Sequence, residues 1–236
     1  MKEAPRLFAD TSKISELEKL LELGIFSGIT TNPIIVAKEA GNSEPRAYYE
    51  ELANRFPGMP ISIQLLDRDV PTLIQEARSL ATISPEIVIK IPMFGDGRGL
   101  AVLSALMKDG VKTNVTALMK AEQLMLALIA ANKNGGPTYV SLFFNRIKDG
   151  KGNAKLEIDK SRKFINKLGF RSKIITGSIR RGEDVYEAIA AGTHIVTVTP
   201  KVIWEMVKHQ KSDEFVSESE NAWSNFISQR ITSTLK

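Results

Sequence analysis

The chain has 236 residues, 43% of them apolar and 25% charged, and this balance is typical of a soluble globular protein. It contains no cysteine, which excludes disulfides, thiolate nucleophiles and cysteine metal sites, and its two histidines are too few for a histidine-based metal site. The net charge of +5 permits binding to nucleic acid. However, the positive residues are spread along predicted helices without an aromatic-and-basic surface motif, so we expect no nucleic-acid partner.

No apolar run in the sequence is long enough to cross a bilayer, so we expect no membrane contact. The first six residues, MKEAPR, lack the apolar stretch of a secretion signal, and a cytoplasmic location is therefore expected. The modest positive charge also favours small anionic substrates.

Short apolar runs alternate with longer amphipathic stretches along the whole chain. The apolar runs predict eight strands, at 7–10, 28–31, 61–66, 87–91, 111–116, 139–144, 174–178 and 194–198. The amphipathic stretches predict helical segments at 14–23, between the second strand and residue 56, and at 70–81, 100–108, 120–132, 155–168, 182–191 and 201–208. In the first helix, Ser12 is the expected N-cap and Gly24 the expected C-cap.

Strands that alternate with helices predict a parallel sheet of the α/β class, and eight such units predict one closed (β/α)8 barrel, the TIM barrel. An open, doubly wound sheet is the alternative, but it normally has a glycine-rich phosphate turn after its first strand, and residues 10–13 here are DTSK. We therefore expect residues 1–236 to form a single domain.

Residues 213–236 are predicted to form an additional C-terminal helix beyond the barrel. It has an apolar stripe that we expect to dock on the barrel or on a neighbouring subunit. The stripe consists of Phe215, Ala222, Trp223, Phe226 and Ile227.

Lys90 interrupts an apolar, β-branched run at 86–92, EIVIKIP, that predicts a buried strand ended by Pro92. An ammonium group buried there is unfavourable unless it is paired or loses its proton. Desolvation lowers the pKa of a lysine, and the neutral amine attacks carbonyl groups. Lys90 could instead extend from an edge strand towards water, or meet a buried carboxylate.

Polar residues stand at the carboxyl ends of the other predicted strands, where the active sites of such barrels lie. Taken singly, each could be a helix cap, a turn residue or a surface charge. Together they predict a ring of functional groups around the lysine. The ring consists of Asp10, Thr31 with Asn32, Gln64, Lys90, Thr116, Asn145 with Arg146, and Ser178 with Arg180.

These residue types suit one kind of chemistry. A neutral lysine forms a Schiff base with a ketone, and the protonated imine accepts electrons when a neighbouring carbon–carbon bond breaks. Asp10, the only acid in the predicted ring, could move the proton of the adjacent hydroxyl. Arg180 follows the seventh strand, where barrels often bind phosphate. The glycine-rich segment 94–99, FGDGRG, is predicted to be a flexible loop beside the site rather than a phosphate loop.

From residue 7 to about 226 the chain resembles the transaldolase family, in particular its short members, which include fructose 6-phosphate aldolases. The matching motifs are FADTS at 8–12, GITTNP at 28–33, IVIKIP at 87–92, TNVT at 113–116, FNRI at 144–147 and TGSIR at 176–180. The resemblance implies a (β/α)8 barrel, no metal or organic cofactor, sugar-phosphate substrates, and a homo-oligomeric ring of subunits such as a pentamer or decamer.

The resemblance also implies roles for individual residues. Lys90 would form the Schiff base, Asp10 would be the acid/base for cleavage, and Thr116 would help to position a catalytic water. Asn32 and Ser178 would hold the dihydroxyacetone unit, and Arg146 and Arg180 the substrate phosphate. The expected catalytic residues are Lys90, Asp10, Thr116 and Gln64, and the expected substrate-binding residues are Thr31, Asn32, Phe143, Asn145, Arg146, Ser178 and Arg180.

Two positions bear on the exact reaction. Gln64 stands where many transaldolases have a glutamate and resembles the fructose 6-phosphate aldolase branch, whereas Phe143 resembles the transaldolases. We expect a transaldolase that passes a dihydroxyacetone unit from a ketose phosphate to an aldose phosphate. An aldolase that releases free dihydroxyacetone and glyceraldehyde 3-phosphate is the close alternative. A non-catalytic sugar-phosphate-binding barrel is the third, and the Asp10–Lys90 pair argues against it.

Overall fold

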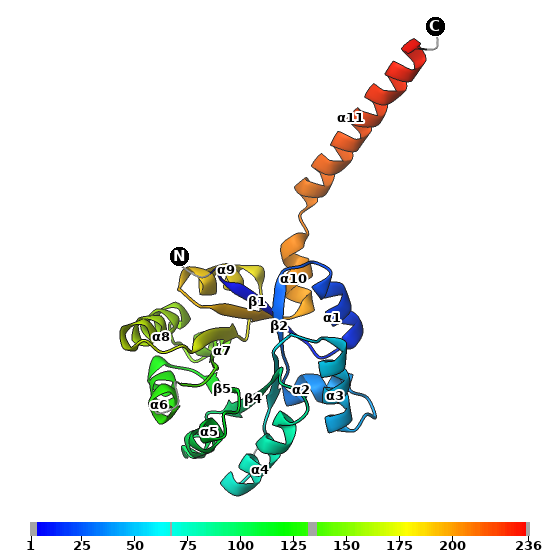
Figure 1. The fold of residues 1–236 in the computed structure, drawn as a ribbon. Helices are drawn as coiled ribbons and strands as arrows, with labels where there is room; N and C mark the ends of the chain where they lie inside the picture. The colour runs from blue at the N-terminus through cyan, green and yellow to red at the C-terminus, as the bar shows by residue number, and fades with distance from the viewer. Residues whose placement is uncertain (1–3, 67, 132–135, 235–236) are drawn as a thin grey trace.

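The computed structural model describes residues 4–66, 68–131 and 136–234, and in this part of the chain eight parallel strands close into a barrel in sequence order (Figure 1). The predicted (β/α)8 barrel is therefore confirmed. The strands are β1 (Arg6–Asp10), β2 (Phe26–Thr30), β3 (Ile61–Gln64), β4 (Ile87–Pro92), β5 (Thr113–Leu118), β6 (Tyr139–Phe143), β7 (Lys173–Gly177) and β8 (Ile195–Val198).

Helices surround the barrel, at least one after each strand (Figure 1). They are α1 (Ile14–Leu21), α2 (Pro33–Glu39), α3 (Pro45–Arg55), α4 (Val70–Ala81), α5 (Arg98–Lys108), α6 (Ala121–Ala131), α7 (Phe144–Asp149), α8 (Ala154–Leu168), α9 (Gly182–Ala190), α10 (Pro200–Val207) and α11 (Gln210–Thr234). Residue 132, which the sequence places at the end of α6, lies outside the described residues.

The first helix does not begin as the sequence predicts. Its N-cap is Lys13, which makes no side-chain capping bond, and its C-cap is Glu22. Ser12 is instead buried and its hydroxyl is bonded elsewhere. Gly24 lies in the turn after the helix with a φ of +69°, a left-handed conformation that favours glycine.

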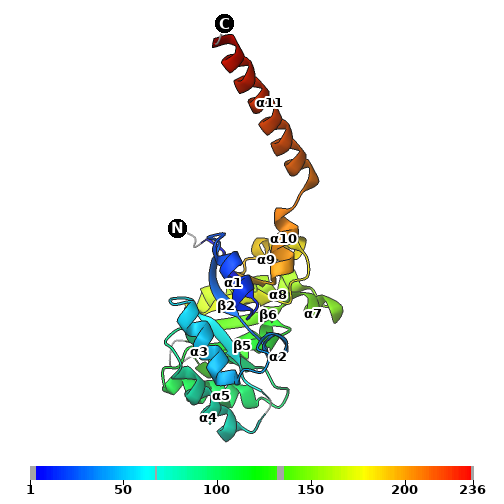
Figure 2. The same cartoon turned by 90° about the vertical axis from the view of Figure 1, so that its right-hand side faces the viewer.

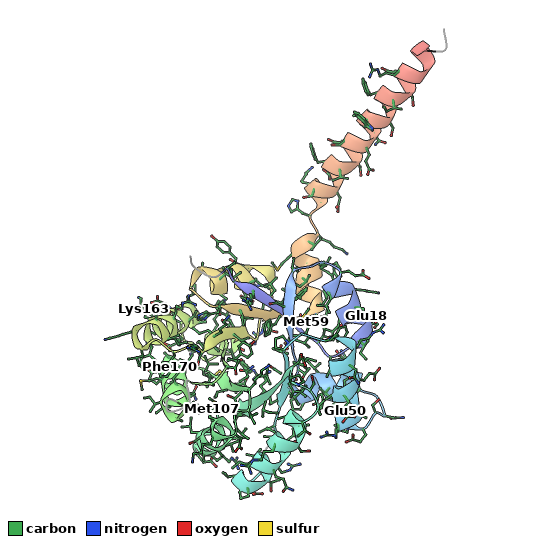
Figure 3. The ribbon with its side chains drawn as sticks, in the orientation of Figure 1. Glu18, Glu50, Met59, Met107, Lys163 and Phe170 are labelled. Atoms are coloured by element: carbon green, nitrogen blue, oxygen red, sulfur yellow. The ribbon has the colours of Figure 1, made fainter. Side chains whose placement is uncertain are left out.

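Alternation along the strands separates two packed regions. In β4, Ile87, Ile89 and Ile91 belong to the main core between the strands and the helices, so Val88 and Lys90 point into the barrel. Figure 3 shows how densely side chains fill this layer, with Met107 packed against the core and Lys163 at the outer surface.

A smaller apolar cluster fills the interior of the barrel near the amino ends of the strands. It consists of Phe8, Ile175 and Ile195, with Tyr139 packed edge-to-face on Phe8 at a centroid distance of 5.8 Å. Gly28 makes room for it, because a Cβ atom there would lie 2.5 Å from the Phe8 ring. The interior is therefore apolar at one end, and its polar side chains lie towards the carboxyl ends of the strands.

The C-terminal helix is where the structure departs most from expectation. α11 begins at Gln210 rather than at residue 213, and it projects away from the barrel as a single rod (Figures 1 and 2). Of the two docking surfaces expected for its apolar stripe, the chain's own barrel is not used, and docking on a neighbouring subunit stays a prediction. Phe215 and Trp223 are 69% and 64% exposed, and Figure 3 shows the side chains of this helix clear of the barrel.

Candidate active site

Lys90 lies near the carboxyl end of β4, inside the barrel, and is only 5% exposed. Its Nζ donates a hydrogen bond to the carbonyl oxygen of Thr31 at 2.9 Å. Burial lowers the pKa of Lys90 below its ordinary value, and the negative charge of Asp10 offsets this shift only in part. The structure thus places an amine that readily loses its proton at the centre of the predicted ring.

Asp10 ends β1 and shares the barrel interior with Lys90. Its Oδ1 accepts a hydrogen bond from the hydroxyl of Thr30 at 2.7 Å. The hydroxyls of Thr30 and Thr197 lie 2.5 Å apart, and Thr197 must donate because the proton of Thr30 is used on Asp10. Burial raises the pKa of Asp10. The charge of Lys90 and the hydrogen bond from Thr30 lower this pKa, and the charge of Glu39 raises it. Within the described residues no direct ion pair joins Asp10 to Lys90, so neither side chain is held in place by the other.

Gln64 and Thr116 flank the lysine. Gln64 is the register partner of Lys90 on the neighbouring strand β3, and Thr116 pairs with Pro92 on β5. The hydroxyl of Thr116 is fully buried, and among the described residues it has no hydrogen-bond partner. An unsatisfied buried hydroxyl is unfavourable, so this group is suited to hold a solvent molecule or part of a substrate.

Below this level, three buried polar side chains cross the barrel interior. The hydroxyl of Ser141 donates to Asn114 Oδ1 at 2.7 Å, and Asn114 Nδ2 donates to the hydroxyl of Ser62 at 3.2 Å. Asn114 is the register partner of Lys90 on β5. These hydrogen bonds fix β3, β5 and β6 relative to one another beneath the lysine.

Thr31 and Asn32 follow β2. Thr31 supplies the carbonyl that Lys90 contacts, and its own hydroxyl donates to the carbonyl oxygen of Ser62 at 2.8 Å. Asn32 caps α2, because its Oδ1 accepts from the backbone N–H groups of Ile34 and Ile35. The group of Asn32 that remains for a substrate is its amide NH2.

Asp184 organises the opposite side of the barrel mouth. This 1% exposed carboxylate accepts bonds from Asn145 Nδ2 at 2.7 Å and from the backbone N–H groups of Arg180 and Arg181 at 3.0 Å each. Burial raises the pKa of Asp184, but these bonds and Lys148 lower it to a net value below the ordinary one. Asn145 also donates to the carbonyl oxygen of Ser178 at 2.8 Å. Asn145 therefore ties the end of β6 to the end of β7.

The two predicted phosphate ligands lie at the rim. Arg146 is exposed on α7, and Arg180 is exposed after β7. Arg180 makes a forked pair with Asp149, with bonds of 2.9 and 2.5 Å, and this contact raises its pKa. Phe143 ends β6, in register with Gly177 and next to this rim.

The segment 94–99 forms a turn that leads into α5. The guanidinium of Arg98 lies 4.3 Å from the centre of the Phe94 ring, and Arg98 also donates to the carbonyl oxygen of Arg68. Gly99 packs against the end of β4, because a Cβ atom there would lie 2.4 Å from the carbonyl oxygen of Pro92. The turn is thereby tied to the connection after β3.

The carboxyl ends of all eight strands thus surround one buried lysine, and a family model described as Transaldolase/Fructose-6-phosphate aldolase matches residues 7–234 of the chain. The chain belongs to the transaldolase/fructose-6-phosphate aldolase family. The predicted resemblance is therefore confirmed, and the chain is a transaldolase-type enzyme.

Three relatives of the transaldolase/fructose-6-phosphate aldolase family illustrate the match. A protein of Clostridium botulinum (strain Hall), named probable transaldolase, is 38% identical over 223 residues, which cover 92% of this chain and 98% of the relative. A probable transaldolase of Moorella thermoacetica is 38% identical over 208 residues, which cover 88% of this chain and 92% of the relative. A probable transaldolase of Geobacillus thermodenitrificans is 36% identical over 218 residues, which cover 92% of this chain and 98% of the relative.

Several polar residues of the site in this transaldolase-type chain were not predicted from the sequence. Thr30, Asn114 and Ser141 share the inward face of their strands with predicted residues, so alternation could have found them. Asp184 and Glu39 lie on helices, and no local pattern distinguishes them from solvent-facing acids. Asp10 was predicted as the only acid in the ring of strand ends, and Glu39, from helix α2, adds a second acid that acts on the pKa of Asp10.

Proposed function

We propose that the protein transfers a dihydroxyacetone unit between sugar phosphates through a Schiff base on Lys90. The observation that carries this proposal is a buried amine of lowered pKa facing a carboxyl group of raised pKa inside a barrel of this family. Each shift moves its group towards the uncharged form, and perturbed groups of this kind suit acid–base chemistry.

The proposed reaction begins when neutral Lys90 adds to the C2 carbonyl of a ketose phosphate and expels water to form an imine. The carboxylate of Asp10 then takes the proton of the C4 hydroxyl while the C3–C4 bond breaks. The electron pair moves into the protonated imine, an aldose phosphate leaves, and an enamine of dihydroxyacetone remains on Lys90. Attack of this enamine on a second aldehyde reverses these steps, and water releases the product.

The neighbouring groups support this course. Arg146 and Arg180 stand at the rim, about where the far end of an extended sugar phosphate would lie, and guanidinium groups bind phosphate with forked hydrogen bonds. Ser178 and the amide of Asn32 would hold the hydroxyls of the three-carbon unit. No metal or organic cofactor is required, because the protonated imine itself accepts the electron pair.

The preferred donors are fructose 6-phosphate and sedoheptulose 7-phosphate, with an aldose phosphate such as erythrose 4-phosphate as acceptor. The second candidate is a fructose 6-phosphate aldolase that releases dihydroxyacetone. Gln64 favours it, because Gln64 is the register partner of Lys90 and can orient a water by hydrogen bonds. A non-catalytic sugar-phosphate-binding barrel is disfavoured, since binding alone does not require a buried amine.

Product analysis tests the proposal. Fructose 6-phosphate is incubated with the enzyme, with and without erythrose 4-phosphate, and the products are separated. Transfer predicts sedoheptulose 7-phosphate only when the acceptor is present, with little free dihydroxyacetone. Free dihydroxyacetone as the main product in both incubations would instead make the enzyme an aldolase, and no turnover of either kind would exclude both.

We also propose that the partner of α11 is a second copy of this chain. A 25-residue helix with exposed Phe215, Trp223 and Phe226 would bury these side chains against an equivalent surface of a neighbouring subunit. The resulting assembly would be a ring of identical subunits.

A further inference from the structure

Glu39, the last residue of α2, reaches the connection that follows Asp10. Its carboxylate accepts hydrogen bonds from the backbone N–H of Ser12 at 3.0 Å, from the hydroxyl of Ser12 at 3.1 Å and from the hydroxyl of Thr11 at 3.2 Å. Thr11 and Ser12 are both buried. The carboxylate of Glu39 therefore holds the two residues that directly follow Asp10.

A second element holds the same connection. The hydroxyl of Tyr48, on α3, donates to the carbonyl oxygen of Ser12 at 2.7 Å. Ser12 is thus bonded through its N–H and hydroxyl to α2 and through its carbonyl to α3. Three bonds to one buried residue fix the end of β1, and with it the direction of the Asp10 side chain.

Glu39 is also electrostatically unusual. Among the described residues no lysine or arginine forms an ion pair with it, although it is partly buried. The hydroxyl of Thr11 also lies 3.3 Å from the carboxylate of Glu16. Glu16, unlike Glu39, forms an ion pair, with Lys13 at 3.5 Å. The charged groups that act on Asp10 are Lys90 from β4, which lowers the pKa of Asp10, and Glu39 from α2, which raises it.

We infer that Glu39 is a positioning residue for carbon–carbon cleavage, which fixes the connection behind Asp10 through its hydrogen bonds to Thr11 and Ser12 and brings a second negative charge behind that carboxylate. This inference rests on the proposed function, because it assumes that Asp10 accepts the proton of the substrate hydroxyl. A more basic carboxylate accepts that proton more readily, and a fixed one stays within reach of it.

The test is the pH profile of cleavage in matched variants. Glu39→Gln keeps an acceptor oxygen but removes the charge, Glu39→Asp keeps the charge, and Glu16→Gln removes the neighbouring acid that already has a cation partner. Cleavage is followed as glyceraldehyde 3-phosphate released from fructose 6-phosphate, across the acid limb of the profile. Thermal unfolding of each variant is measured in parallel, and Glu39→Ala replaces Glu39→Gln if the latter does not fold.

Loss of the Glu39 charge lowers the pKa of Asp10, so the acid limb of Glu39→Gln should move towards lower pH. At the acid end, its rate relative to the rate at the optimum should rise about threefold or more. In Glu39→Asp and Glu16→Gln, the acid limb of the pH profile should lie at the same pH as in the wild type. Ser12→Ala, which loses one bond to Glu39 but no charge, should slow cleavage without moving the limb.

Two results would overturn the inference while leaving the proposed function intact. One is an acid limb of Glu39→Gln that coincides with that of the wild type, and the other is an equal shift in Glu16→Gln. Borohydride treatment of the wild type with fructose 6-phosphate distinguishes these two results from a failure of the proposed function itself. If it yields no reduced adduct on Lys90, the proposed function fails, and the inference about Glu39 fails with it.

Discussion

Lys90 is buried, and among the described residues its Nζ makes one protein hydrogen bond, to a backbone carbonyl. Borohydride with fructose 6-phosphate or dihydroxyacetone should therefore trap a reduced three-carbon unit on Lys90 and inactivate the enzyme, because the proposed imine would form there. Mass spectrometry of proteolytic peptides locates the adduct. Lys90→Met should show neither adduct nor turnover, and an adduct on another lysine would refute the mechanism.

Asp10→Asn is the companion of that experiment. It should still give the adduct with dihydroxyacetone, whereas cleavage of fructose 6-phosphate should fall by about 10²-fold or more, because the proton acceptor is lost. A variant that cleaves at the wild-type rate would assign the proton transfer to another group.

Arg180 is expected to exchange the carboxylate of Asp149 for the substrate phosphate. Arg180→Ala, and likewise Arg146→Ala, should raise KM for phosphorylated sugars far more than for unphosphorylated ones. The loss of a charge-assisted pair should amount to about 1.5–3 kcal/mol. Steady-state kinetics with fructose 6-phosphate and with fructose measure the difference. Equal losses on both substrates would show that the arginines are structural.

Gln64 and Phe143 are expected to set the balance between transfer and release. Release requires a proton for the carbanion and a water for the imine; Gln64 can orient water but cannot exchange protons, and Phe143 can do neither. We therefore expect transfer to exceed release. Phe143→Tyr should raise release, and Gln64→Glu should raise transfer, measured as dihydroxyacetone against sedoheptulose 7-phosphate. If wild-type enzyme mainly releases dihydroxyacetone in the presence of erythrose 4-phosphate, this ranking is wrong.

At the scale of elements, Asp184 near the start of α9 joins the ends of β6 and β7. Asp184→Asn removes a buried acceptor of several hydrogen bonds and should lower the free energy of unfolding by about 1.5–3 kcal/mol at neutral pH. It should also raise KM for phosphorylated sugars, because the backbone of Arg180 loses its anchor. Chemical denaturation and steady-state kinetics measure the two effects.

The pH dependence of that loss follows from the lowered pKa of Asp184 in the folded protein. The stabilisation by the carboxylate is complete above the unfolded-state pKa and disappears as the pH falls through the lower, folded-state value. The difference between wild type and Asp184→Asn should therefore be largest at neutral pH and shrink in acid. A difference that does not depend on pH would mean that packing, rather than charge, is responsible. Asp159→Asn, on the exposed face of α8, serves as the control.

The elements were predicted well where periodicity is strong. Helix α4 and strand β6 agree with the pattern to within one residue, and β4 ends at Pro92 as expected. Helix α7 was missed, because its six residues follow β6 directly and its N-cap, Phe143, makes no side-chain capping bond. The start of β5 was placed two residues early, because Val111 is apolar and packs on the core although the ladder begins at Thr113.

The candidate site was predictable to the extent that its residues lie on strands. The closed barrel brings all eight strand ends together, so polar residues at the ends of β1 to β7 predict the ring around Lys90. Glu39 and Asp184 act through tertiary contacts across 27 and 39 residues of sequence, and no local pattern encodes such contacts.

At the scale of the whole molecule, α11 should hold the assembly together. The wild type is expected to have a solution mass several times its 26.1 kDa, and Trp223→Lys with Phe226→Lys should lower that mass, because charges would enter the buried contact. Analytical ultracentrifugation measures both. Asn221→Lys with Asn225→Lys, on the other side of the helix, is the matched control. A monomeric wild type would contradict the prediction.

The apolar cluster of Phe8, Ile175, Ile195 and Tyr139 fills the barrel interior towards its amino end, and the exposed Arg146 and Arg180 lie at the opposite, carboxyl end. Substrates of the proposed reaction would enter and leave past the rim where Arg146 and Arg180 lie. Two sugar phosphates would compete for that passage, and the first aldehyde must leave before the second can enter. In the proposed mechanism, the covalent bond to Lys90 would retain the three-carbon fragment during this exchange. The proposed function therefore predicts ping-pong kinetics, with parallel double-reciprocal lines and inhibition by excess acceptor.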